Sequence, residues 1–172
     1  TNCRISNEAD KRKSVVFYLP ERATVATSST VTTSGCGVNI TVTPADVFLM
    51  PGGYDNNQDA DTPNAADSVG RAVFAVNTAT GQVLNNLKFS HTTHPELGMT
   101  HSVLDLSAFD HDSDGIVSRI YFGDLGGHVF ALKDDQQMSY TVCERTITRS
   151  VVDGIWSGKK LFDASADGVQ RK

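Results

Sequence analysis

The clearest hairpin signal in the chain is Ile120-Tyr121-Phe122-Gly123-Asp124-Leu125-Gly126-Gly127-His128-Val129-Phe130-Ala131-Leu132. Two short apolar runs, at 120–122 and 129–132, lie on either side of a glycine-rich reversal. Short apolar runs that are separated by Gly and Asp are typical of strands joined by tight turns. This stretch therefore predicts a pair of antiparallel strands.

The same pattern recurs along the chain from Asp46 onward. Further apolar runs lie at 47–50, 72–76 and 102–106. Between two of the predicted strands, Asn77-Thr78-Ala79-Thr80-Gly81 ends in a glycine that can take the positive φ of a hairpin turn. No long segment has helical periodicity, so the sequence predicts an all-β domain made of antiparallel hairpins.

The N-terminal part of the chain has a different composition. Ten of the twenty residues at 24–43 are Ser or Thr, and β-branched Val and Ile lie between them. Such residues disfavour a helix, and the alternation of Val38, Ile40 and Val42 with polar residues predicts a half-buried strand. We therefore divide the chain into a Ser/Thr-rich β segment at 1–45 and a region of regular hairpins at 46–172.

Composition excludes several classes of protein. The chain has 172 residues, a net charge of −5 and 39% hydrophobic residues, enough for one domain with a core. Its acidic balance argues against binding to nucleic acid or to an anionic membrane surface. No stretch approaches the roughly 20 apolar residues of a membrane span. Because the sequence starts at Thr1 without a signal sequence, we expect a mature or excised piece.

The chain has three cysteines, Cys3, Cys36 and Cys143, without CxxC spacing or histidines placed for zinc. In an exported protein one pair can form a disulfide and the third cysteine stays free or bonds outside this chain. Because Cys3 and Cys36 share the polar N-terminal segment, we expect these two to pair. The alternative is three free thiols in a cytosolic protein.

The strongest chemical signal is Asp110-His111-Asp112-Ser113-Asp114-Gly115-Ile116-Val117-Ser118. Carboxylates at positions 1, 3 and 5 of a tight loop point toward one centre, glycine at position 6 allows the turn, and the carbonyl of position 7 can point inward. Oxygen ligands in this register suit Ca²⁺, which also removes the repulsion among the carboxylates. The predicted calcium ligands are Asp110, Asp112, Asp114, Ile116 through its carbonyl, and Ser118.

Two positions depart from the pattern of an EF-hand. Position 9 is Ser118, where a carboxylate is usual, so one ligand is neutral or is replaced by water. Position 12 is Tyr121 instead of glutamate, and the loop leads into a predicted strand. We therefore expect a calcium loop on a hairpin, with binding in the micromolar-to-millimolar range of extracellular modules.

Other polar features are weaker. Asp55, Asn57, Asp59 and Asp61 place oxygen ligands at alternate positions, but this stretch lacks the turn glycine. We therefore expect a solvated loop there, with a second calcium site as the alternative. We expect His91, His94 and His101 to lie at the surface or in hydrogen bonds, and His128 to be a strand residue. No nucleophile elbow, P-loop or dinucleotide motif is present, so the sequence does not predict an enzyme.

The calcium loop and the predicted strand and turn after it resemble a known family. The pattern Asp-x-Asp-x-Asp-Gly, continued by Tyr121-Phe122-Gly123-Asp124-Leu125-Gly126-Gly127, is similar to the calcium blade of the PilY1-type C-terminal β-propeller of type IV pilus tip and assembly factors. Met50-Pro51-Gly52-Gly53-Tyr54-Asp55, the hairpin at 70–84 and the segment at 156–162 agree with this family in order and spacing. The resemblance covers about residues 46–162.

The resemblance implies an exported protein at the pilus tip or cell surface, associated with the periplasm or outer membrane. Its partners would be minor pilins or a host or abiotic surface, and calcium would regulate pilus assembly and attachment. The resemblance places calcium on Asp110, Asp112, Asp114 and the Ile116 carbonyl, with Ser118 at the position of the family's last aspartate. A propeller needs at least four blades, whereas about two are recognisable here. This suggests a fragment of a larger propeller or a partial, open one.

Two other functions fit parts of the pattern. A generic calcium-stabilised repeat, similar to the integrin FG-GAP type, would carry the same aspartate loop in a structural or ligand-binding role. A piece of a quinoprotein-type enzyme would share the Ala79-Thr80-Gly81 hairpin. Repeated aspartate loops in the parent gene would favour the integrin-like module, whereas a long N-terminal region beside pilin genes would favour the pilus protein.

Overall fold

The computed structural model describes residues 20–55 and 66–164, and all of its regular structure apart from one short turn is β. Ten strands are present in these two ranges, every paired neighbour within a sheet is antiparallel, and the one 3₁₀ turn is η3(Pro95–Leu97). The prediction of an all-β chain built from antiparallel hairpins is confirmed. Within the described ranges, no helix has the length and apolar character that crossing a membrane requires.

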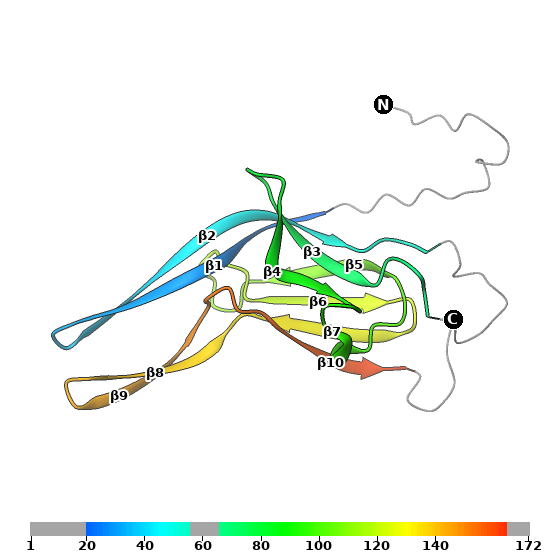
Figure 1. The fold of residues 1–172 in the computed structure, drawn as a ribbon. Helices are drawn as coiled ribbons and strands as arrows, with labels where there is room; N and C mark the ends of the chain where they lie inside the picture. Colours follow the sequence, from blue (N-terminus) through cyan, green and yellow to red (C-terminus); the bar gives the residue numbers. More distant parts are fainter. Residues whose placement is uncertain (1–19, 56–65, 165–172) are drawn as a thin grey trace, which may run out of the picture.

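The first sheet is a meander of four strands that follow one another in the chain (Figure 1). The hairpin predicted at 77–81 joins the third and fourth of them. There the Asn77 carboxamide oxygen accepts the N–H groups of Ala79 and Thr80, and Gly81 has a φ of 70°. The strands are β1(Glu21–Ser34), β2(Gly37–Pro51), β3(Ala72–Asn77) and β4(Val83–Ser90).

The second sheet repeats this arrangement with one insertion. Its strands lie in the order β10-β7-β6-β5. Along the chain, β8 and β9 are inserted between β7 and β10, and they form a separate hairpin that projects from the sheet (Figure 1). The strands of the sheet are β5(Val103–Phe109), β6(Arg119–Asp124), β7(His128–Lys133) and β10(Ser157–Asp163); those of the insertion are β8(Gln136–Val142) and β9(Arg145–Val151). The sequence Ile120–Leu132 is thus the β6–β7 hairpin, as predicted.

The two sheets share one hydrophobic core. Each strand turns alternate residues inward, as the period of two requires, so Leu49, Phe89, Ile120 and Phe130 are all almost completely buried in one cluster. Trp156 also belongs to this cluster. The opposite faces of the sheets remain partly apolar at the surface: Phe48 and Met50 on β2, Tyr121 on β6, Val129 on β7 and Leu161 on β10 are at least one-third exposed.

Two long hairpins project beyond the paired sheets on the same side of the molecule (Figure 1). We call them arm 1, formed by residues 28–43 of β1 and β2, and arm 2, formed by β8 and β9. Arm 1 contains the predicted strand, and Val38, Ile40 and Val42 are half-buried while their polar neighbours are exposed, as the alternation predicted. Strand β2 runs continuously from arm 1 into the first sheet across residues 45 and 46, where the division of the chain was drawn. That division stays a prediction.

A disulfide joins the tips of the two arms. Cys36 lies in the turn of arm 1 and Cys143 in the turn of arm 2, and their Cα atoms are 5.3 Å apart. The predicted pairing of Cys36 with Cys3 is therefore wrong. Proximity along the chain suggested that pair, whereas the actual bond spans 107 residues because the fold returns arm 2 to the side of arm 1. Cys3 lies outside the described residues.

Candidate metal centres

The predicted calcium loop connects β5 to β6, whose end residues Phe109 and Arg119 face each other across the hairpin. The structure brings together the three carboxylates that the sequence singled out: Asp110, Asp112 and Asp114 offer oxygens that all lie within 4.8 Å of one another. Asp112 and Asp114 are exposed and Asp110 is half-buried. The loop therefore gathers three negative charges at one open end of the second sheet.

Hydrogen bonds within the loop hold this shape. The Asp110 carboxylate accepts the backbone N–H groups of Ser113 (2.7 Å), Asp114 (3.3 Å) and Gly115 (2.8 Å). These donors, that of Gly115 above all, lower the pKa of Asp110 below its usual value, so the carboxylate stays ionised. Asp114 accepts the N–H of Ile116 at 2.8 Å. Gly115 has a φ of 90°, a conformation that glycine adopts without strain.

The other two predicted ligands come after the turn. Ile116 is half-buried, and its N–H donates to the Asp114 carboxylate. Ser118 is only 2% exposed, and its side-chain oxygen has no hydrogen-bond partner among the described residues. Buried hydroxyls almost always have such a partner, so the Ser118 Oγ atom is a candidate contact for a water or an ion.

The end of the loop is fixed to three other elements. The N–H of Val117 donates to the Thr24 carbonyl of β1 at 2.7 Å, in a parallel bridge that pairs Val25 with Val117. The N–H of Ser118 donates to the Phe109 carbonyl, and the Ser118 carbonyl accepts the N–H of Asp134 at 2.9 Å. These hydrogen bonds connect the end of the loop to the first sheet and to the residue after β7.

Asp134 is itself a perturbed carboxyl group at the base of arm 2. Burial raises its pKa to about 6. The carboxylate also accepts the N–H groups of Asp153 and Gly154, which lower the pKa, but the effect of burial is larger. A folded-state pKa above the unfolded value means that the folded protein holds the proton more tightly. The contribution of Asp134 to stability is therefore full at low pH and is lost as the pH rises from about 4 toward 6.

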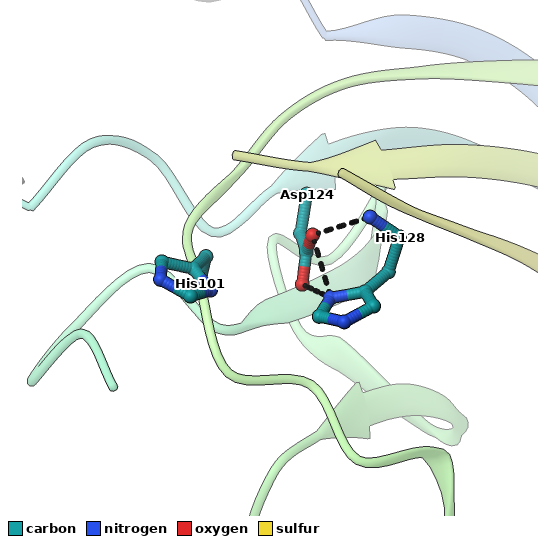
Figure 2. Close-up of side chains that lie close together, drawn as sticks. All are labelled: His101, Asp124 and His128. Carbon is teal, nitrogen blue, oxygen red and sulfur yellow. Dashed lines mark hydrogen bonds and ion pairs between the residues drawn. The ribbon is translucent and has the colours of Figure 1, made fainter. Parts of the chain in front are cut away.

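A second group of potential metal ligands lies at the opposite end of β6. His101, Asp124 and His128 offer ligand atoms within 4.8 Å of one another (Figure 2). Asp124 ends β6, His128 begins β7 across the Gly126-Gly127 turn, and His101 lies in the loop before β5. Figure 2 shows the His128 ring turned toward the Asp124 carboxylate, with distances of 2.8 and 3.0 Å from Nδ1 to the two carboxylate oxygens.

The sequence did not point to this second cluster. His128 is a strand residue and His101 is half-buried with a hydrogen bond to Thr100, as predicted, but their closeness to Asp124 was not foreseen. The Asp124-x-x-x-His128 spacing across a tight turn is a signal that could have been used. His101 is distant in sequence from the turn, so no spacing pattern indicated that it lies near Asp124 and His128. His91 and His94 do not belong to either group of potential ligands among the described residues.

The expected solvated loop at 55–61, and the alternative of a second calcium site there, are not tested, because residues 56–65 lie outside the described ranges. Asp55 itself is buried, and its carboxylate accepts the N–H and hydroxyl of Ser68 and the N–H of Val69. These hydrogen bonds hold Ser68 and Val69, which follow that segment in the chain, next to Asp55.

Comparisons of the chain with models of known protein families, with curated proteins and with solved structures found no match.

Proposed function

We propose that this chain is an exported calcium-binding β-domain that forms part of a PilY1-type propeller in a type IV pilus tip or assembly protein. The observation that carries the proposal is the aspartate loop, in which three carboxylates converge on the end of the β5–β6 hairpin. Oxygen donors at this density suit a hard divalent cation such as Ca²⁺. Ser118, at the end of the loop, has a buried hydroxyl without a hydrogen-bond partner among the described residues.

The architecture is compatible with two blades of a propeller. Blades are four-stranded antiparallel sheets that pack face to face around a centre. Here two such sheets share a core, and their outward faces carry exposed Phe48 and Met50 on one side and Tyr121, Val129 and Leu161 on the other. Such side chains suit faces that neighbouring blades cover, so we propose that further blades of the parent protein pack there.

The proposed role of calcium is to hold the loop rigid. The ion would cancel the repulsion among Asp110, Asp112 and Asp114, and the Val117–Thr24 hydrogen bond would pass this rigidity to the first sheet. Binding to the folded state alone stabilises it by linkage, by about 2.7 kcal/mol at a free ion concentration of a hundred times Kd. In the pilus, calcium occupancy would in this way regulate assembly or attachment through minor pilins or a target surface.

Substituting Asp112 with alanine is expected to abolish calcium-dependent stabilisation while the metal-free protein keeps its stability. The backbone N–H groups within the loop donate to the carboxylates of Asp110 and Asp114, so removing the Asp112 carboxylate takes away a proposed ligand and leaves these bonds of the turn in place. The measurement is the thermal midpoint of metal-stripped protein titrated with Ca²⁺, where the parent should gain several degrees. Asp105→Ala, which removes an exposed aspartate of β5 outside the loop, is the matched control.

Two results would refute the calcium site. One is a parent protein that gains no stability up to millimolar Ca²⁺. The other is a calcium response of Asp112→Ala that equals the responses of the parent and of Asp105→Ala.

The pilus role has its own test, in cells that carry the full-length parent protein. Antibody raised against this domain should label the ends of sheared pili in electron micrographs. Label spread over the cell surface and absent from pili would support the calcium-stabilised module similar to integrin repeats instead, even if the loop binds calcium. Quinone-dependent turnover by the full-length protein would support the third possibility, a quinoprotein-type enzyme.

A further inference from the structure

We propose that His101, Asp124 and His128 form a second metal site, which takes a divalent transition metal such as Zn²⁺ and does not depend on the aspartate loop. Two imidazoles and one carboxylate make up the donor set. Imidazole nitrogen suits Zn²⁺, Cu²⁺ and Ni²⁺, whereas Ca²⁺ takes oxygen ligands. The two clusters therefore differ in the class of ion that each prefers.

The carboxylate of this cluster is held rigidly in place. The Asp124 side chain is completely buried, and its Oδ1 atom accepts the backbone N–H groups of Gly126 and His128, both at 3.0 Å. These bonds fix the carboxylate at the inner side of the β6–β7 turn, where the His128 ring meets it. A ligand oriented by backbone donors loses little conformational freedom on binding a metal.

His128 has a partner on each ring nitrogen. Its Nδ1 atom faces Asp124, while its Nε2 atom lies 3.2 Å from an oxygen of Asp163 on β10. Histidines that bind a metal through one nitrogen commonly donate the other ring N–H to a carboxylate, which orients the ring and strengthens it as a ligand. Asp163 is in turn 3.2 Å from Lys160, which places it for this supporting role.

His101 completes the cluster from the loop before β5. Its ring lies so close to the turn that a Cβ atom on Gly126 would come within 2.3 Å of Nδ1, so glycine at 126 makes room for the ring. The ligand atoms lie within 4.8 Å of one another, whereas ligands on a tetrahedral zinc are about 3.4 Å apart. Metal binding therefore requires the half-buried His101 side chain to rotate toward the other two ligands, and a water would supply the fourth ligand.

The competing explanation is an ion-paired His128, held between Asp124 and Asp163 without any metal. This explanation needs no contribution from His101. The role of His101 in metal binding therefore separates the two.

The experiment is a calorimetric titration of metal-stripped protein with Zn²⁺, together with a Co²⁺ titration followed by its visible absorption. All variants carry Cys3→Ser, because a free thiol can itself bind zinc. We expect one Zn²⁺ per chain and a tetrahedral Co²⁺ spectrum, with affinity at least tenfold weaker in His101→Ala. His111→Ala and Asp112→Ala, which alter the aspartate loop, should bind Zn²⁺ like the parent.

The thermal midpoint of metal-free His101→Ala is measured first, and a value equal to that of the parent shows that the variant is folded. Absence of Zn²⁺ binding in the parent would overturn the proposal, as would an unchanged affinity in His101→Ala. A zinc site lost in His111→Ala would also overturn it, since the ion would then occupy the aspartate loop. Calcium binding at that loop is measured separately, so the two proposals can fail independently.

Discussion

Replacing Gly70 with alanine is expected to destabilise the protein by roughly 2–5 kcal/mol, a large share of a typical domain's stability. Gly70 has a φ of 83°, and a Cβ atom there would lie 2.2 Å from the carbonyl oxygen of Gly53 and 2.5 Å from the Ser102 hydroxyl. Left-handed backbone costs an alanine roughly 1–2 kcal/mol, and a clash with backbone adds about 1–3 kcal/mol more.

This contact matters because it joins the two sheets. The Gly70 carbonyl accepts the N–H groups of both Ala72 and Val103, and the N–H of Gly53 donates to the Val103 carbonyl. The chain after β2, the chain before β3 and the start of β5 thus meet through backbone hydrogen bonds. A displaced backbone at Gly70 would loosen all three elements together.

Gly81→Ala provides the matched control. Gly81 has a φ of 70°, but no atom lies within 4 Å of its added Cβ, so the variant carries the backbone strain without the clash. Urea unfolding of the two variants measures the difference, with Gly81→Ala losing roughly 1–2 kcal/mol. Equal losses would show that the close approach of Gly53 and Gly70 contributes nothing to stability.

Local patterns in the sequence were enough to predict most of the strands. The turn at 77–81, the alternation of Val38, Ile40 and Val42 and the β6–β7 hairpin all arise from residues that are neighbours in the chain. Arm 2 was not predicted as a hairpin, although Met138, Tyr140 and Val142 alternate with polar residues. Its pattern lacks the glycine that marks the other turns: Cys143 and Glu144 take positive φ at its tip instead.

The two candidate metal sites show the same limit of local sequence patterns. The three carboxylates of the aspartate loop lie within five residues, so their spacing alone predicted that they converge. The second cluster and the Cys36–Cys143 bond need contacts between distant segments, which depend on how the sheets pack. Cysteine connectivity in particular cannot be deduced from spacing.

Cys143→Ser is expected to lower the free energy of unfolding by roughly 2–5 kcal/mol. The Cys36–Cys143 bond spans 107 residues, and closing a loop of about 100 residues removes chain entropy worth about 4.7 kcal/mol from the unfolded state. Urea unfolding of oxidised parent and variant measures this loss. Cys3→Ser is the matched control, because it removes a cysteine that does not take part in the bond.

The loss should appear first in arm 2. Its two strands pair only with each other, and an isolated hairpin is marginally stable in water. Val142 at the tip and Val151 at the base of the arm are nevertheless almost fully buried, and the tip disulfide holds arm 1 beside arm 2. Amide exchange in Cys143→Ser should therefore accelerate across β8 and β9 more than in the core strands β6 and β7. Unchanged exchange in arm 2 together with an unchanged urea midpoint would mean that packing at the base of the arms holds them without the bond.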